Sequence, residues 1–545
     1  MSIQLYDTTL RDGAQREGIS FSVEDKVKIA RKLDELGVHF IEGGWPGSNP
    51  KDTEFFRRMQ GVSLSSSILV AFGSTRRANT RTEDDPNIRA LLETKLKIGT
   101  LVGKGSAEHV TRILKTSLRE NLAMISDSVR YLRSRGLTVF FDAEHFFDGY
   151  KRDAEYALRT IETAAEAGAE CLVLCDTNGG SMPHEISAIV ERARSCGVPL
   201  GIHAHNDMGL AVANTLAAVR AGATHVQGTI NGYGERCGNA NLCSILPTLQ
   251  LKMGLDCVNP EQLARLTGIS RYVSEVANLA PLPHLPYVGA SAFGHKAGMH
   301  IAAMAKAEES YQHIDPSLVG NSSRILVSEL SGVSTILYKV KEYGLDFAAP
   351  TPQARAILKQ VKHLENQGFK YDDAEASFEL LLYRAQPDYR PPFELIDFMV
   401  VVEKHRRLPT TSSGGTLSEA MVKVKVGEEI YHTAAEGSGP VNALDRALRK
   451  ALLQFYPDLA IVKLIDYKVR ILEESEGTEA RVRVVIESSD GQHQWATVGS
   501  STNIIEASWI SLADSLEYWL VKKARTLNTS HSPAGNCIDS IRASS

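Results

Sequence analysis

The alternation of apolar and polar residues divides the chain into two parts with different periodicity. In roughly the first 255 residues, short apolar runs predict buried strands, and the segments between them show the 3.6-residue apolar spacing of helices. The predicted strands are residues 3–8, 38–43, 68–73, 96–102, 138–143, 171–176, 200–204 and 226–231. The clearest helices are residues 23–36, 118–135, 154–167, 183–196 and 210–221. Eight such strand–helix units in about 250 residues are typical of an α/β fold, the (β/α)8 TIM barrel.

The ends of these helices carry the expected signals. A glycine follows four of the helical segments, at Gly37, Gly136, Gly168 and Gly197, and a left-handed glycine commonly ends a helix. Ser22 and Asp25 are spaced like a capping box at the start of the first helix, although the acid is aspartate where glutamate or glutamine is preferred.

The pattern of apolar and polar residues changes after the barrel. Residues 354–366 and 372–384 read as helices in a polar connection. Alternating strands follow at 393–404, 418–426, 462–472, 479–487 and 494–499, with amphipathic helices at 441–454 and 504–523. We therefore predict a barrel over 1–255, a helical subdomain and linker over 256–390, an α+β module over 391–525 and a disordered Ser/Thr-rich tail over 526–545.

Composition narrows the class of protein. The chain has 545 residues, with 60 basic and 65 acidic side chains and a net charge of −5. Without a dense basic run, nucleic acid is not expected as a partner. The sequence contains no run of 18 apolar residues and no charged-then-apolar leader, so we expect a cytoplasmic protein that does not associate with a membrane. Seven cysteines without CxxC spacing suit reduced thiols.

Polar side chains gather where the predicted strands end. His203 and His205 follow an apolar run and, at i and i+2, project to one face. Asp12 follows the first strand and Asn239 the eighth. A closed barrel places the last strand beside the first and would bring these four side chains together. An open doubly wound sheet also alternates strands and helices, but it would keep the first and last strands apart.

Each of these residues also has an ordinary structural interpretation. A single strand histidine is usually a core residue, Asp12 could cap the turn made with Gly13 or pair with Arg11, and Asn239 could stabilise its own loop. Only their joint geometry predicts a metal site. The mixed oxygen and nitrogen set suits a catalytic Mg²⁺, Mn²⁺ or Zn²⁺ ion with open positions. Such an ion could polarise the ketone of a chelating α-keto acid, and Arg11 could stabilise the alkoxide that develops.

Three separated motifs carry a resemblance to a known family. They are DTTLRDGAQ at 7–15, HAHND at 203–207 and GERCGN at 234–239. These motifs resemble the signatures of the 2-isopropylmalate synthase, homocitrate synthase and citramalate synthase family, and the similarity extends from residue 3 to about residue 523. Family members condense the methyl carbon of acetyl-CoA, a co-substrate, with an α-keto acid and then hydrolyse the thioester.

The resemblance assigns further roles. It makes Asp12, His203, His205 and Asn239 the metal ligands and places Arg11 against the substrate ketone. Thr177 would bind the keto acid carboxylate, and Glu144 would lie by the acetyl group to assist enolisation or orient the thioester. Segments at 292–300 and 311–316 resemble the family's small subdomain. By this resemblance the chain is a homodimer in which His300 and Tyr311 reach the partner's active site and take part in proton transfer or water activation.

The α-keto acid that accepts the acetyl group is predicted from residues 40–52, FIEGGWPGSNPKD. This loop looks more like the branch of the family that uses pyruvate and forms (R)-citramalate on a route to isoleucine. The main alternative is a 2-isopropylmalate synthase, which takes 2-oxoisovalerate in leucine synthesis. A metal-dependent 3-hydroxyacyl-CoA lyase would need the same polarised oxygen, but the module after residue 393 argues against it. A catalytically dead sensor is disfavoured because Asp12 and both histidines are present.

Two Gly/Ser turns open helices in the C-terminal module, at 436–444 and 499–508. Backbone N–H groups at a helix start can hold a carboxylate. The module resembles the family's regulatory domain, which binds an end-product amino acid at a dimer interface. That resemblance implies an isoleucine effector, with regulatory residues Gly437, Ser438, Gly439, Ser501 and Asn503. An ordinary capped loop is the equally weighted alternative.

Overall fold

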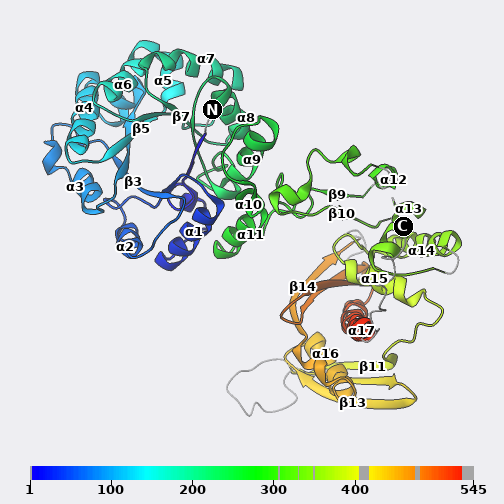
Figure 1. Cartoon of the computed structure of the whole chain (residues 1–545). Helices are drawn as coiled ribbons and strands as arrows, with labels where there is room; N and C mark the ends of the chain where they lie inside the picture. The colour runs from blue at the N-terminus through cyan, green and yellow to red at the C-terminus, as the bar shows by residue number, and fades with distance from the viewer. Residues whose placement is uncertain are drawn as a thin grey trace, which may run out of the picture. The chain divides into compact units, whose positions relative to one another are not determined.

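The computed structural model describes residues 3–296, 298–304, 307–328, 331–347, 350–403, 417–472 and 479–530. It divides into two compact units. The first consists of Met1–Gly294 and Gln312–Arg324, and the second of His295–Tyr311 and Ile325–Ser545. Figure 1 shows the helices and strands of both units.

The first unit is built on a closed barrel of eight parallel strands in sequential order, β1 to β8. The strands are β1 Gln4–Asp7, β2 Phe40–Glu42, β3 Ile68–Ser74, β4 Ile98–Lys104, β5 Thr138–Glu144, β6 Cys171–Asp176, β7 Leu200–Ala204 and β8 His225–Gly228. Closure is made by β1 and β8, which run side by side from Gln4↔His225 to Asp7↔Gly228. The predicted fold class is therefore confirmed, and the open-sheet alternative is wrong.

Helices surround the strands on the outside of the barrel (Figure 1). They are α1 Val23–Leu36, α2 Pro50–Met59, α3 Pro86–Glu93, α4 Leu118–Ser134, α5 Phe146–Arg152, α6 Ala154–Glu166, α7 Pro183–Ala193, α8 Ala211–Arg220, α9 Leu242–Pro247, α10 Pro260–Leu263 and α11 Leu266–Val276. The sequence analysis did not single out α2, α3 or α5, because seven to ten residues span too few turns to establish a 3.6-residue period.

The predicted helix signals are present. Ser22 Oγ accepts a hydrogen bond from the Asp25 backbone N–H, and the Asp25 carboxylate accepts one from the Ser22 N–H. This is the capping box despite its aspartate. The four glycines that follow helices all have positive φ, between 70° and 100°, the left-handed region that only glycine adopts without steric cost.

A layer of large side chains fills the interior of the barrel. Its buried members include Tyr6, Phe40, Val70, Ile98, Phe140, Cys171 and Val173. The rings of Phe40 and Phe140 meet edge to face with centroids 5.2 Å apart, a favourable aromatic geometry. Because this layer occupies the interior, the open space of the barrel lies toward the carboxyl ends of the strands.

The segment after the barrel contributes short strands and helices. They are β9 Gly294–His295, β10 Arg324–Ile325, α12 Gly298–Met304, α13 Val333–Glu342, α14 Pro350–Asn366 and α15 Glu375–Arg384. The two predicted linker helices correspond to α14 and α15. In the second unit α15 is fixed to the C-terminal helix, where Arg384 forms ion pairs with Asp514 and Glu517 at 2.7 Å each.

The C-terminal module consists of two three-stranded antiparallel sheets, ordered β11-β12-β13 and β14-β15-β16. The strands are β11 Glu394–Glu403, β12 Leu417–Val426, β13 Glu429–Gly437, β14 Lys463–Ile471, β15 Val482–Ser489 and β16 Gln494–Ser501; the helices are α16 Pro440–Leu452 and α17 Ile504–Ser530. The predicted α+β character is confirmed. The helix α17 extends past the predicted tail boundary at 526, and residues 531–545 lie outside the described residues.

The sequence analysis missed strand β13. This strand carries His432, Thr433 and Glu436 among its apolar residues and has no clean two-residue alternation. It forms because a hairpin turn with Gly427 at φ 61° folds it back along β12, from Val426↔Glu429 to Ser418↔Gly437. Pairing with a neighbouring strand, rather than its own pattern, therefore decides its structure.

The two halves of the module repeat one design. Each is a three-stranded sheet followed by a helix, and each first strand carries a register irregularity at a Leu-Ile-Asp sequence, at Leu395/Asp397 and Leu464/Asp466. In both halves the aspartate side chain accepts the N–H of the next residue at 2.8 Å. The module is thus an internal structural repeat.

Candidate metal-binding active site

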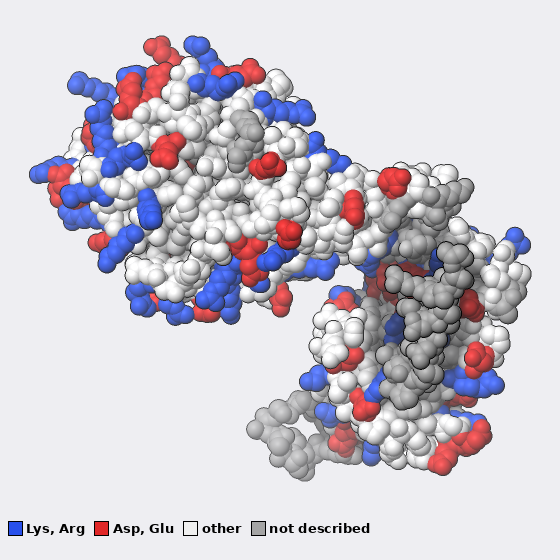
Figure 2. All heavy atoms as spheres, in the orientation of Figure 1, with Lys and Arg blue, Asp and Glu red and all other residues white. Residues whose placement is uncertain are grey.

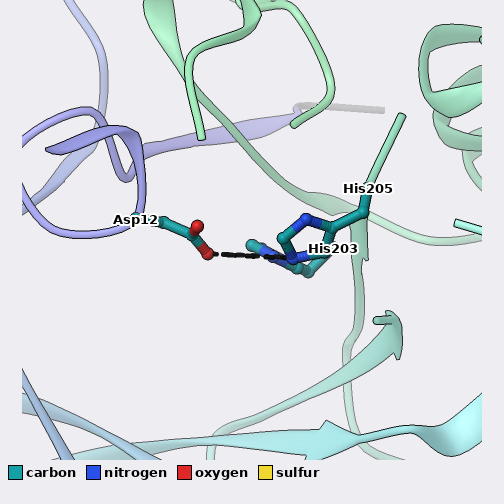
Figure 3. Close-up of side chains that lie close together, drawn as sticks. All are labelled: Asp12, His203 and His205. Atoms are coloured by element: carbon teal, nitrogen blue, oxygen red, sulfur yellow. Dashed lines mark hydrogen bonds and ion pairs between the residues drawn. The ribbon is translucent and has the colours of Figure 1, made fainter. Parts of the chain in front are cut away.

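Three side chains that could hold a metal ion converge at the carboxyl ends of the barrel strands (Figure 3). Asp12 follows β1, and His203 and His205 lie on and just after β7. The Asp12 Oδ2 atom lies 3.4 Å from His203 Nε2 and 4.0 Å from His205 Nε2. The two Nε2 atoms are 3.3 Å apart. Closure of the barrel through β1 and β8 brings these residues together although they are far apart in sequence.

Asn239, the fourth predicted metal ligand, lies beside Asp12. Its Nδ2 donates to Asp12 Oδ1 at 3.1 Å and to the Tyr233 carbonyl at 3.0 Å. Its Oδ1 is buried and has no hydrogen-bond partner, which is unusual for a buried amide oxygen. Gly234 permits this packing, because a Cβ there would lie 2.1 Å from Asn239 Nδ2.

The donor set fits one divalent ion. Two imidazole nitrogens and a carboxylate oxygen spaced 3.3 to 4.0 Å apart are close enough to share an ion with bonds of about 2.0–2.2 Å. Burial would raise the pKa of Asp12, but the Arg11 charge together with His203 and His205 outweighs burial and holds that pKa below its ordinary value. Burial and the adjacent His203 lower the pKa of His205 to about 4. Asp12 is therefore an anion and His205 a neutral imidazole near pH 7, the forms that bind metal.

Gln227 on β8 orients one of the histidines. His203 Nδ1 lies 2.9 Å from Gln227 Oε1, and Gln227 Nε2 donates to Asp142 Oδ1 at 3.1 Å. An N–H on Nδ1 leaves the Nε2 lone pair directed at the site. The sequence analysis did not identify Gln227. The available signal was a fully buried glutamine in a short strand, which needs polar partners.

Arg11 lies beside the metal-ligating residues and is firmly held. Its Nε donates to Glu42 Oε2 at 2.6 Å, and its guanidinium lies over the Phe72 ring at 3.9 Å. Tyr6 OH donates to the other Glu42 oxygen at 2.7 Å. Burial would lower the pKa of Arg11, but the charges of Glu42 and Asp12 outweigh it and raise that pKa. Arg11 is a fixed cation that can stabilise negative charge on a substrate oxygen.

These residues line a cavity of about 580 Å³ at the mouth of the barrel, a size suited to a small ligand. Glu144 and Thr177 line it too. Glu144 pairs with Lys104, and Thr177 Oγ1 accepts the His145 backbone N–H at 2.8 Å. His145 has φ 58°, an uncommon conformation for this residue type, and this turn aims its N–H at Thr177. The structure thus collects Arg11, Glu144 and Thr177 with the metal-ligating side chains.

His300 and Tyr311 belong to the second unit. Their rings stack with centroids 4.1 Å apart and planes inclined by 21°, and Tyr311 is 44% exposed. Neither His300 nor Tyr311 is among the described residues that line the barrel cavity. Their predicted contact with a partner's active site stays a prediction.

The two predicted regulatory turns differ in the structure. At the second turn, Asn503 Oδ1 caps α17 by accepting the Ile505 and Glu506 N–H groups at 2.8 and 3.4 Å, and Ser501 Oγ donates to Glu506 at 2.5 Å. At the first turn, Gly439 precedes α16 without a side-chain cap, while the Ser438 N–H donates to Asn442 Oδ1 at 3.2 Å. Gly437 ends β13. Only the α16 turn keeps N-terminal amides without a side-chain acceptor.

Three known family models match successive segments of the chain. Residues 2–273 match the HMGL-like family model, residues 287–368 the homocitrate synthase post-HMGL domain-like model, and residues 374–520 the LeuA allosteric (dimerisation) domain model. The first match covers the barrel, and the last covers both halves of the C-terminal module.

Full-length relatives are also similar to this chain. An (R)-citramalate synthase of Geobacter sulfurreducens is 53% identical, with 95% of this chain and 98% of that protein covered. One of Aquifex aeolicus is 51% identical over the same shares. A 2-isopropylmalate synthase of Methanocaldococcus jannaschii is 31% identical over 96% of both chains. The higher identity lies with the two (R)-citramalate synthases.

Charged side chains of both signs share the surface of the protein (Figure 2). On the face shown in Figure 2, the Lys and Arg side chains of the described residues are interspersed with Asp and Glu. Among the described helices, none is both long and apolar enough to cross a membrane.

Proposed function

The chain belongs to the (R)-citramalate synthase family, and from that premise we propose that its barrel joins the methyl carbon of acetyl-CoA to the ketone carbon of pyruvate. Water then cleaves the thioester, and (R)-citramalate and free CoA leave. The observation that carries this proposal is the convergence of Asp12, His203 and His205 beside a fixed Arg11 in one cavity. A Claisen-type condensation needs both a polarised ketone and a cation beside the oxygen that becomes charged.

The residues Asp12, His203, His205 and Asn239 would hold a divalent ion. Asn239 Oδ1, buried and otherwise unpartnered, supplies the amide oxygen of the predicted set. When bound, the ion supplies Lewis-acid polarisation of the keto acid. Mg²⁺, Mn²⁺ and Zn²⁺ all accept such a mixed oxygen and nitrogen donor set.

The chain's own side chains orient the two substrates. The Thr177 hydroxyl oxygen already accepts the His145 N–H, so its proton is free to be donated to the pyruvate carboxylate. Arg11 donates to the ketone oxygen as that oxygen gains charge. Glu144, held by Lys104, lies by the acetyl group and assists removal of a methyl proton or orients the thioester. Most of the acceleration comes from stabilising the enolate and alkoxide.

A second copy of the chain would complete the reaction. By family resemblance, His300 and Tyr311 of one subunit serve the partner's cavity in proton transfer or water activation. Support for a dimer comes from β11 and β14. Each pairs on one side only among the described strands, and both expose apolar side chains, including Val402 at 55% and Ile471 at 54%. Exposed apolar edge strands are typical of association surfaces.

A thiol-release assay tests the acceptor. Purified protein with acetyl-CoA and a divalent ion should release CoA faster with pyruvate than with 2-oxoisovalerate. The expected preference is about tenfold or more, because the second acceptor adds two carbons to a pocket that can discriminate by about 1–3 kcal/mol per methylene. Equal or inverted preference would favour the 2-isopropylmalate synthase alternative, which the 31% identical relative supports.

Isoleucine is the proposed effector, bound through the C-terminal module at the turn that opens α16. Gly439 offers a direct test. Its backbone is extended at φ −167°, and a Cβ added there would meet nothing within 4 Å. The Gly439→Leu variant should therefore fold normally, occupy the space before the open amides and weaken isoleucine inhibition about tenfold or more, with unchanged activity when isoleucine is absent.

The matched control is Gln492→Leu, which places the same side chain on an exposed turn of the same module. Inhibition equal in both variants and the parent protein would exclude the α16 turn as the effector site. A shift from isoleucine to another amino acid as the strongest inhibitor would correct only the identity of the effector.

A further inference from the structure

One cation at the cavity is not neutralised by the protein. The basic residues that line the cavity are Arg11, Arg76, Arg77, Lys104 and Arg236. Four have carboxylate partners: Arg11 with Glu42 and Asp12, Arg76 with Glu120 and Asp127, Lys104 with Glu144, and Arg236 with Asp207. Arg77 is exposed, and within the described part of the chain its guanidinium pairs with no carboxylate.

The backbone of Arg77 is held by two hydrogen bonds, although its guanidinium has no carboxylate partner among the described residues. Its N–H donates to Asp85 Oδ2 at 2.9 Å, and its carbonyl accepts from Arg76 Nη1 at 3.1 Å. Arg76 is itself anchored to α4 through Glu120 at 2.7 Å and Asp127 at 2.8 Å. The loop after β3 therefore presents one unpaired guanidinium from a stationary position.

Apolar side chains line the cavity beside this cation. Ala78 follows Arg77 on the same loop, while Leu114 and Met124 come from the loop after β4 and from α4. Leu114 is 36% exposed. An apolar rim with one unpaired cation is complementary to a long, partly aliphatic ligand that ends in an anion. Neither pyruvate nor a divalent ion has that shape or that charge distribution.

We propose that Arg77 binds a phosphate group of CoA and so positions the acetyl donor, with the pantetheine arm along the rim made by Ala78, Leu114 and Met124. This proposal rests on the proposed function, which identifies acetyl-CoA as the donor. A guanidinium matches phosphate oxygens with paired N–H donors and keeps its charge at any working pH. Arg77 is a binding residue that holds the donor. In the proposed function Arg11 stabilises the charge on the ketone oxygen and Glu144 acts by the acetyl group.

Two acetyl donors separate this role from a general defect. Arg77→Ala should raise the KM for acetyl-CoA about five- to tenfold, as expected for loss of one exposed charge-assisted hydrogen bond. The KM for S-acetylpantetheine, which lacks every phosphate, should change less than about twofold. Acetyl-dephospho-CoA shows which phosphate is bound, since a loss of the Arg77 effect with this donor assigns the 3′-phosphate. Arg77→Lys should fall between the parent and the alanine variant.

Arg89→Ala is the matched control, because Arg89 is an exposed arginine on α3 that pairs with Asp84 outside the cavity; its KM values should equal those of the parent. Calorimetric binding of CoA without pyruvate tests Arg77 independently of turnover. An equal rise in KM for both donors, or unchanged CoA affinity in Arg77→Ala, would overturn the proposal. Normal CoA binding without thiol release in the parent protein would instead contradict the proposed function.

Discussion

The barrel mouth and the C-terminal module depart from an ordinary soluble protein in opposite ways. At the mouth, charged and polar side chains such as Asp12, His203 and Gln227 are buried, at 4%, 5% and 0% exposure. In the module, β11 and β14 leave aliphatic side chains in water, with Val402 at 55% and Ile471 at 54%. Burying polar groups costs free energy unless they have partners, and exposing apolar edges invites association. Both departures support the proposals made above, a metal and substrate site at the mouth and a dimer interface on the edge strands.

If these proposals hold, the two regions recognise their partners by different physical means. The mouth relies on directional groups with fixed spacing, where a shift of one side chain removes a ligand. The edge strands rely on apolar area and free backbone hydrogen-bonding groups, which tolerate single changes better. Substitutions at the mouth should therefore have larger effects than substitutions on the strands.

The largest effect is expected from His203→Ala. Loss of one imidazole should reduce turnover by at least about 1,000-fold, or about 4 kcal/mol of transition-state stabilisation. It should also abolish the rise in melting temperature that a bound divalent ion gives the parent. His184→Ala, on α7 outside the cavity, is the control. Full turnover with unchanged metal affinity would refute the role of His203.

A smaller effect is expected from Gln227→Leu, which removes the partner of His203 Nδ1 without removing a ligand. Metal affinity should fall about 10- to 100-fold, the usual range for residues that orient ligands. Turnover at saturating metal should recover most of its parent value. The control is Gln60→Leu on an exposed helix end. If metal affinity stayed constant while turnover fell, Gln227 would act on substrate rather than on His203.

The smallest effect concerns the edge strands. Met399→Lys combined with Val469→Lys places two charges on side chains that are 48% and 42% exposed, so the fold should be kept. The dimer dissociation constant, measured by sedimentation, should rise about tenfold or more because charge is introduced into an apolar surface. The control is Gln492→Lys, which adds a charge to an exposed turn and should leave the dimer dissociation constant unchanged.

The same double variant tests the proposal that His300 and Tyr311 of one subunit act in the active site of the partner subunit. If subunits complement each other, activity should fall in proportion to the monomer fraction and return at high protein concentration. Monomers with full activity would show that each chain supplies its own proton-transfer residues.

Local patterns predicted much of this protein. Strands β6 and β7 coincide with their predicted limits at Cys171–Asp176 and Leu200–Ala204, and α1 coincides at Val23–Leu36. The order of the motifs predicted that Asp12 and the histidine pair would meet, because a barrel of eight strands must close. Two features that depend on their partners escaped prediction: Gln227, whose hydrogen bonds go to residues on other strands, and β13, whose structure depends on pairing with β12.

The sequence by itself determined the eight strands and the longer helices of the barrel, the capping of those helices and the kinds of ligand available, because these depend on neighbours within about four residues along the chain. Only the tertiary structure decided that Asn239 Nδ2 donates to Asp12 across 227 residues, that its Oδ1 is left unpartnered, and that Arg77 is the unpaired cation among the described residues at the cavity. Those facts depend on which faces of distant strands and loops come into contact, and packing, not local propensity, fixes that.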